Sequence, residues 1–149
     1  MSRLLNFLSI KLFLCVFSLF FVTSIYAENI INKATETEIS LVDGIALDKE
    51  GNIYISMREH NIISRIDTKG MMTRFAGSGE SGFFGDGGAA VNAKLKTPAN
   101  LTFDAKGNLY IADRENHRVR KVDTKGNIST FAGSGKSGFS GDGGLAVKA

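Results

Sequence analysis

The chain has 149 residues, of which 43% are hydrophobic and 22% are charged, and its formal net charge at pH 7 is +3. Lys and Arg are interleaved with Asp and Glu, so the sequence contains no continuous basic stretch. We therefore expect no nucleic-acid partner. The single cysteine, Cys15, excludes a disulfide framework. The length suits one small domain.

The first 27 residues have the pattern of a secretory signal peptide. Arg3 and Lys11 flank the start of an apolar run at 12–22, and the small residue Ala27 precedes a polar segment. This pattern predicts export with cleavage after Ala27, and therefore a secreted or periplasmic protein. The alternative is an uncleaved membrane anchor over residues 4–26. We expect contact with a membrane only through this segment.

After a polar N-terminal segment at 28–40, the chain divides into two similar repeats, 41–96 and 97–149. Gly51 in the first repeat corresponds to Gly107 in the second, at an offset of 56 residues that holds along the repeat without insertion. About half of the aligned positions are identical. A long fixed period indicates one supersecondary unit that buries its apolar face only against a neighbouring copy.

Each repeat contains four short extended runs separated by turn residues. In the second repeat these runs are Leu101–Phe103, Leu109–Ala112, Arg118–Val122 and Ile128–Phe131. The segments 104–108 and 123–127 place Asp before a Gly-Asn pair, which is typical of hairpin turns. Four antiparallel strands per repeat are the pattern of a β-propeller blade. The sequence therefore predicts an all-β chain with about two four-stranded blades of an incomplete propeller, after an N-terminal signal helix.

A glycine-rich connector follows the fourth run of each repeat, at 133–144 in the second. Its GxGxxG pattern does not open a helix in a βαβ unit, so we expect no dinucleotide and no other cofactor. The Gly-Asp-Gly-Gly motif around Asp142 supplies one carboxylate, whereas calcium needs several oxygen ligands, so we expect no metal. We predict instead that Asp86 and Asp142 bond loop amides.

The second repeat resembles the NHL-repeat family, in the long-linker type of secreted bacterial proteins and teneurin-like propellers. The resemblance rests on the run 107–121, in which Asn116 and His117 occupy the eponymous positions, and on the connector that follows it. The first repeat departs from the pattern, because Met57 stands at the position of Asp113. We expect that repeat to keep the blade and lose part of its loop.

The resemblance implies a β-propeller, usually of about six blades, that acts as a binding surface for proteins, glycans or RNA. Export argues against the RNA-binding members. Some propellers are enzymes with several metal ligands around a central channel, whereas this chain offers only His60 and His117. We therefore expect a binding or scaffold protein with a protein or glycan partner. We expect no enzymatic activity.

The strand order places the loop at 114–117 and the connector at the same end of the blade. Loops on a rigid scaffold commonly carry binding sites. We therefore predict a binding face with no catalytic residue, made of Arg114, Glu115, Asn116, His117, Lys136, Phe139 and Asp142.

Ala149 corresponds to Ala93, in the middle of the first connector. We therefore expect a truncated member of a longer propeller family. Two alternatives stay open. Three chains assemble by cyclic symmetry into a six-bladed homotrimer, or the chain is part of a propeller-type lyase or hydrolase whose catalytic residues lie in missing blades.

Overall fold

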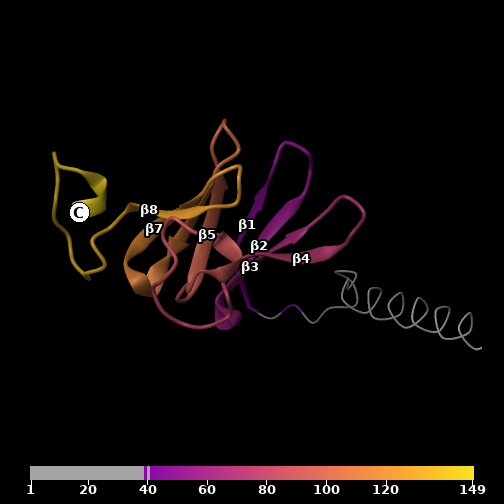
Figure 1. Cartoon of the computed structure of the whole chain (residues 1–149), viewed down its shortest axis with the longest axis horizontal. Coiled ribbons are helices and arrows are strands. Elements are labelled where there is room, and N and C mark those ends of the chain that lie inside the picture. The colour runs from indigo at the N-terminus through magenta and orange to yellow at the C-terminus, as the bar shows by residue number, and fades with distance from the viewer. Residues whose placement is uncertain (1–38, 40) are drawn as a thin grey trace, which may run out of the picture. The chain divides into compact units, whose positions relative to one another are not determined.

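The computed structural model describes residues 39 and 41–149 of the chain. The predicted signal peptide, and nearly all of the polar segment at 28–40, lie outside the described residues. In the described part, two four-stranded sheets follow one another, each with its strands in sequence order (Figure 1). All strand pairs are antiparallel. The prediction of an all-β chain with two propeller blades is confirmed.

The two sheets, called blade 1 and blade 2 below, have closely matched boundaries. Blade 1 consists of β1 (Val42–Leu47), β2 (Ile53–Met57), β3 (Ile62–Ile66) and β4 (Met72–Ala76). Blade 2 consists of β5 (Pro98–Phe103), β6 (Leu109–Asp113), β7 (Arg118–Val122) and β8 (Ile128–Ala132). Short 3-10 helices lie between strands at η2 (Arg58–His60), η3 (Ala90–Asn92) and η4 (Arg114–Asn116), and a fourth, η5 (Ala146–Lys148), follows β8.

The tight hairpins are held by aspartate side chains, as the sequence indicates. In the β5–β6 turn, Asp104 Oδ1 accepts the backbone N–H of Lys106 and of Asn108 at 2.9 Å each. Gly107 follows with φ +85°, a conformation that L side chains rarely adopt. Asp48, Asp67 and Asp123 make equivalent pairs of amide bonds in the other turns. One Asp thus satisfies two amides in each of these four tight turns.

The core lies within and between the two blades. Ile63, Leu109 and Ile111 of the inner strands are at most 1% exposed. Leu95, in the connector between the blades, is fully buried with them. Tyr54 of β2 contacts the Phe103 ring of β5 edge to face, with ring centroids 4.9 Å apart. The two blades therefore share one apolar core, as expected for repeats that cannot bury their apolar faces alone.

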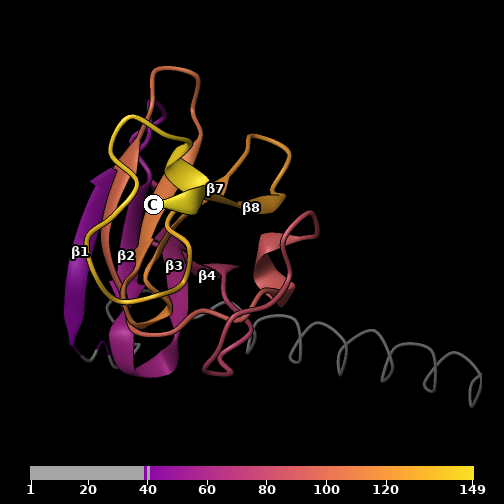
Figure 2. The ribbon, with the colours of Figure 1, turned by 90° about the vertical axis from the view of Figure 1, so that its left-hand side faces the viewer.

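β1 and β5 approach each other closely across the blade boundary, as the turned view shows (Figure 2). A Cβ atom on Gly44 would overlap the Ala99 carbonyl oxygen and lie 2.9 Å from the Asn100 Cα. Glycine is therefore required at this position by the backbone of the next blade.

Candidate functional site

The loops between the second and third strands of the two blades have the same backbone shape. In each, a 3-10 turn is followed by a residue in the left-handed region, Asn61 with φ 54° and His117 with φ 51°. The N–H of each left-handed residue donates to the carbonyl of the first residue of the turn, Arg58 or Arg114. The two loops therefore have equivalent backbones on neighbouring blades, although Asn116 is buried where the equivalent His60 is exposed.

A shallow groove of about 680 Å³ lies between these loops. It is lined by Arg58, Glu59, Asn61, Ser81, Thr97, Arg114, Glu115 and His117. The side-chain oxygen of Asn61 accepts the N–H of Thr97 at 3.0 Å, which fixes the floor of the groove across the blade boundary. We call this surface the loop groove.

The structure brings together three of the seven residues predicted for the binding face. Arg114, Glu115 and His117 are exposed and line the loop groove. Glu115 also forms an ion pair of 3.4 Å with Lys96, a pair exposed to water and therefore weak. These side chains can exchange water for the polar groups of a partner at little cost.

Asn116 lies elsewhere, in the interior. It is 8% exposed, and its Nδ2 donates to the Gly82 carbonyl at 2.7 Å and to Asp113 Oδ2 at 2.8 Å. Its amide thus connects its own blade to the preceding connector.

The last three predicted residues, Lys136, Phe139 and Asp142, lie on the segment after β8. All three are exposed, and Phe139 is 88% exposed. None of them lines the loop groove. The predicted face is therefore divided into two surfaces, the loop groove and this segment.

A buried arginine, Arg120 of β7, ties the first connector to blade 2. Its side chain is fully buried and donates to Asp86 Oδ1 from Nε at 3.1 Å and from Nη2 at 2.8 Å. It also donates from Nη1 to Asp113 Oδ2 at 3.3 Å. The second carboxylate oxygen of Asp86 accepts the Thr130 hydroxyl at 2.7 Å. The prediction that Asp86 bonds loop amides was wrong, because its partners are side chains of the next blade.

Asp113 completes this network from β6. Its Oδ1 accepts the N–H of Lys96 at 2.7 Å, and its Oδ2 accepts from Asn116 and Arg120. Removal from water raises the pKa of Asp113, although the bonds from Asn116, Lys96 and Arg120 act in the opposite direction. Both oxygens already have protein partners, so this carboxylate holds the blades together.

The network was missed because its key residue, Arg120, has no counterpart in the first repeat, where Ser64 occupies the position. Arg120 stands opposite Ile111 in the sheet register. An arginine paired with a core isoleucine is the signal that points to a buried ion pair.

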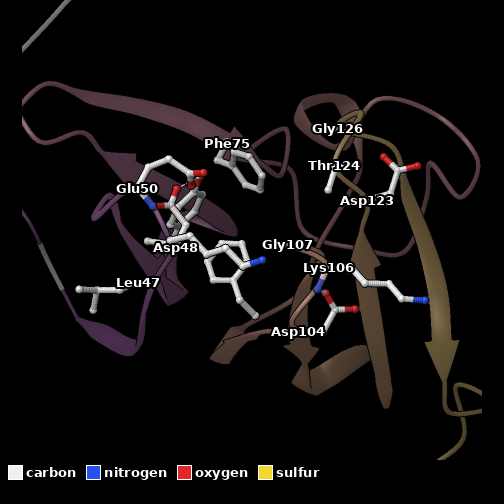
Figure 3. A pocket seen from close by; sticks show the side chains of 13 residues that line it. Leu47, Asp48, Glu50, Phe75, Asp104, Lys106, Gly107, Asp123, Thr124 and Gly126 are labelled. Atoms are coloured by element: carbon white, nitrogen blue, oxygen red, sulfur yellow. Dashed lines mark hydrogen bonds between the residues drawn. The ribbon is translucent and has the colours of Figure 1, made fainter.

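A second hollow, of about 530 Å³, lies at the tight hairpins (Figure 3). The Asp48 turn of blade 1 faces the Asp104 and Asp123 turns of blade 2 across it. Tyr54, Phe75 and Phe103 line its apolar part, with Tyr54 contacting both phenylalanine rings edge to face. We call this hollow the turn cavity. The sequence indicated only tight turns here.

The polar groups of the turn cavity are largely engaged in the hairpins. Asp48 Oδ2 accepts from Asn52 Nδ2 at 2.7 Å and from the Tyr54 hydroxyl at 3.1 Å. Burial and the bond to Asp48 raise the pKa of Tyr54 to about 12, so the phenol keeps its proton at neutral pH. These groups support the turns and are poorly placed to exchange protons with a ligand.

Within residues 39 and 41–149, no group of three or more His, Cys, Asp or Glu side chains is arranged to hold a metal ion. In the same part of the chain, no helix has the length and apolar character needed to cross a membrane.

Two adjoining four-stranded antiparallel blades, joined by a connector that packs on the second blade, define a β-propeller repeat protein. Residues 78–142 match the family model described as the teneurin NHL domain. This match, over less than half of the chain, supports the resemblance to the NHL-repeat family seen in the sequence. The long-linker type of secreted bacterial proteins stays a prediction.

Curated proteins that are similar to this chain support the same resemblance. NHL repeat-containing protein 2 of Bos taurus is 32% identical over 105 residues, which cover 63% of this chain and 14% of that protein. Teneurin-1 of Caenorhabditis elegans is 37% identical over 93 residues, which cover 55% of this chain and 3% of that protein. The chain thus spans only a small part of the length of these relatives.

Solved structures share the fold. A structural genomics protein of unknown function from Bacteroides thetaiotaomicron matches with a TM-score of 0.53 and 19% identity, over 62% of this chain and 36% of that one. An auxiliary nutrient binding protein from the same organism matches with a TM-score of 0.50 and 24% identity, over 68% and 26%. At these identities the likeness establishes the fold alone.

Proposed function

We propose that this chain is an exported, non-catalytic binding module whose loop groove takes a protein partner. The observation that carries the proposal is the pairing of two homologous loops across one groove. Exposed Arg114 and Glu115 lie on one side, and exposed Glu59 lies on the other beside half-buried Arg58, which is ion-paired with Asp43 at 3.3 Å. Each loop thus presents an adjacent basic and acidic side chain.

The charge pattern favours a protein. A surface with both signs of charge at fixed positions is complementary to another polypeptide, and such complementarity sets orientation and specificity. Arginine is also enriched at protein interfaces. The rigid blade boundary holds both loops in place, since the Asn61 side chain bonds the backbone of Thr97.

A binding role, with no chemistry, is supported by the use already made of the carboxylates. Asp113 bonds three groups of the protein, and Asp48 and Asp104 bond the amides of their own turns. A general base needs a carboxylate or imidazole within reach of a substrate proton. In the described residues these three carboxylates serve the fold.

Export is proposed from the pattern of residues 1–27. Expression of the whole chain in a bacterial host, followed by fractionation and mass spectrometry, tests it. We expect a product that begins at Glu28 outside the cytoplasm. A full-length product that stays with the membrane would support an uncleaved anchor.

The binding proposal is tested by selecting peptides from a display library on the immobilised whole chain, with an oligosaccharide array in parallel. We expect the peptides to lose about tenfold in affinity when Arg114→Glu and Glu115→Lys are introduced together, since both contact charges are reversed. Glu50→Lys, in the turn cavity, is the matched control and should leave binding unchanged.

Three results would contradict the proposal. One is a selection that yields no peptide above background. Another is peptide binding that depends on Glu50 and is indifferent to the loop variants, which would move the site to the turn cavity. The last is loop-dependent binding confined to oligosaccharides, which would make the partner a glycan.

A further inference from the structure

The segment after β8, residues 133–149, has the same shape as the connector at 77–93, and the two are called connector 2 and connector 1. Equivalent backbone bonds close both: Gly77 to Ala90 and Gly133 to Ala146 at 2.9 Å, and Ser78 to Ala93 and Ser134 to Ala149 at 2.7 Å. Each ends in a short 3-10 helix, η3 or η5. Connector 2 therefore has the folded shape of connector 1, although no blade packs on it in the described structure.

Connector 1 shows what this shape binds. Its Asp86 carboxylate holds Arg120 of blade 2, and the Phe83 ring lies 3.9 Å from the guanidinium carbon of Arg118. Its backbone adds to the edge of β8, where Gly87 N–H donates to the Ile128 carbonyl at 2.7 Å and Ile128 N–H donates to the Gly88 carbonyl at 2.9 Å. Connector 1 is thus a dock for the following blade.

Connector 2 presents the same groups without partners. Phe139 and Asp142 correspond to Phe83 and Asp86, and both are exposed. The N–H groups of Gly143 and Ala146, which correspond to those bonded in connector 1, have no acceptor among the described residues. Figure 1 shows this segment, in yellow, projecting beyond β8. An apolar ring, a carboxylate and free backbone donors are therefore presented together.

Blade 1 of a second copy does not supply the matching surface. The positions of Asp113, Asn116, Arg118, Arg120 and Thr130 in blade 2 are occupied in blade 1 by Met57, His60, Ile62, Ser64 and Arg74. The buried guanidinium that holds Asp86 is replaced by Ser64, whose hydroxyl lies 3.5 Å from the sulfur of Met57. The basic residue Arg74 lies on the outer strand β4 and donates to the Ser78 carbonyl of connector 1.

We propose that connector 2 is a docking surface for one kind of partner, an NHL blade that carries Asp, Asn and Arg at the repeat positions of Asp113, Asn116 and Arg120. In the docked state, Asp142 binds the arginine of that blade and Phe139 covers its guanidinium. Blade 1 of this chain is not such a blade, so copies of the chain do not close into a ring through connector 2.

The test uses the whole chain extended after Ala149 by a second copy of residues 94–149, so that Lys94 follows Ala149 as it follows Ala93 in the native order. Hydrogen exchange is measured at connector 2 in the native chain and in three extended chains. The first is unaltered and the second carries Asp142→Asn. In the third, the added blade has Met and Ser at the positions of Asp113 and Arg120.

We expect exchange at Gly143 and Ala146 to slow by about tenfold or more in the unaltered extended chain. This protection should be reduced by Asp142→Asn and lost in the chain whose added blade has Met and Ser. Protection at Ile63 and Ile111 serves as the internal check that blades 1 and 2 stay folded. Equal protection in the first and third chains would overturn the proposal, as would an added blade that stays unfolded.

Sedimentation of the native chain and its Asp142→Asn variant provides the second measurement. We expect both to sediment alike, with no association that depends on Asp142. A native trimer that dissociates in the Asp142→Asn variant would show that blade 1 of a second copy is the partner, and would overturn the proposal.

Discussion

Blade 1 and blade 2 have the same strands and the same turns but differ in what they bury at one position. Ile55 of β2 pairs with Ser64 in blade 1, and the equivalent Ile111 of β6 pairs with Arg120 in blade 2. Ser64 contacts Met57, whereas Arg120 contacts Asp113 and the connector. The same four-stranded sheet therefore accommodates either pair. Because the strands are alike in both blades, the contacts that distinguish one blade from the other are made by a few inward-facing side chains.

The difference has a physical reason. A buried guanidinium is costly unless it is paired and its N–H groups are satisfied. In blade 2, connector 1 supplies Asp86 and the carbonyl of Phe84, 3.3 Å from Arg120 Nη2. The carbonyl of Lys94, the next residue after connector 1, lies 3.4 Å from Arg120 Nη1. In blade 1 a serine and a methionine fill the place without needing such partners. In blade 2, the arginine thus stands where connector 1 packs.

Removal of Arg120 should have the largest effect on stability. Arg120→Ala leaves Asp113 buried without its guanidinium and frees Asp86, so we expect the free energy of unfolding to fall by about 3 to 5 kcal/mol. Urea denaturation followed by circular dichroism measures the change. A loss below about 1 kcal/mol would mean that water replaces the guanidinium at this site.

The double variant Asp113→Met with Arg120→Ser sharpens this comparison, because it gives blade 2 the residues of blade 1. We expect it to be more stable than Arg120→Ala, since it removes the unpaired carboxylate together with the arginine. Equal or lower stability would show that the carboxylate is not the source of the loss.

The glycine at the blade boundary should have the next largest effect. In Gly44→Ala the new methyl group meets the Ala99 carbonyl, so β1 and β5 must separate, at a cost of about 1 to 3 kcal/mol. The equivalent position in blade 2 is Asn100, which is exposed. Asn100→Ala is therefore the matched control and should change stability by no more than about 0.5 kcal/mol. Thermal unfolding of both variants compares the two positions.

Phe83 and Phe139 provide another matched pair. The Phe83 ring lies over the guanidinium groups of Arg118 and Arg120, at 3.9 and 4.8 Å, so Phe83→Ala should cost about 1 to 2 kcal/mol. Phe139 is 88% exposed, and Phe139→Ala should change stability by at most about 0.5 kcal/mol. Chemical denaturation of the two variants tests the contrast. Equal losses would mean that connector 2 already packs on a partner surface.

Much of the fold could be predicted because it is encoded locally. The Asp and Gly-Asn turns define the hairpins, and the second repeat's run Arg118–Val122 coincides with β7. The contacts between blades could not be predicted in the same way. Asp86 and Arg120 are 34 residues apart, and the residue at the position of Arg120 differs between the repeats, where the first has Ser64. With two unlike copies and no third, the sequence did not indicate which residue type the interface requires.

The candidate site shows the same division. Arg114, Glu115 and His117 follow one another in a loop, and their shared location in the loop groove could be expected from strand order. Asn116 lies in the same loop, yet its side chain turns inward to Gly82 and Asp113. The direction of the Asn116 side chain depends on the packing of connector 1, which is distant in the sequence. A local sequence pattern therefore cannot predict it.

The smallest effect is expected from protonation of the turn aspartates in acid. Protonation of Asp104 in blade 2 should destabilise the protein more than protonation of Asp48 in blade 1. Bonds from the Asn108 side chain and backbone lower the pKa of Asp104 from 3.8 to about 2. The pKa of Asp48 is also lowered, but burial opposes the bonds from Asn52. A folded pKa below the unfolded value stabilises the protein above about pH 4, and this stabilisation is lost as the pH falls towards 2.

Thermal unfolding between pH 5 and pH 2 should therefore show a Tm that falls with pH in the native chain. The fall should be shallower in Asp104→Asn than in Asp48→Asn, because the group with the larger pKa shift has been removed. Glu50→Gln, at an exposed position in the same kind of turn, is the control and should follow the native curve. If Asp104→Asn also follows the native curve, the acid sensitivity does not arise from this turn. The Asp48 and Asp104 hairpins would then be equivalent in their response to acid as well as in their backbone geometry.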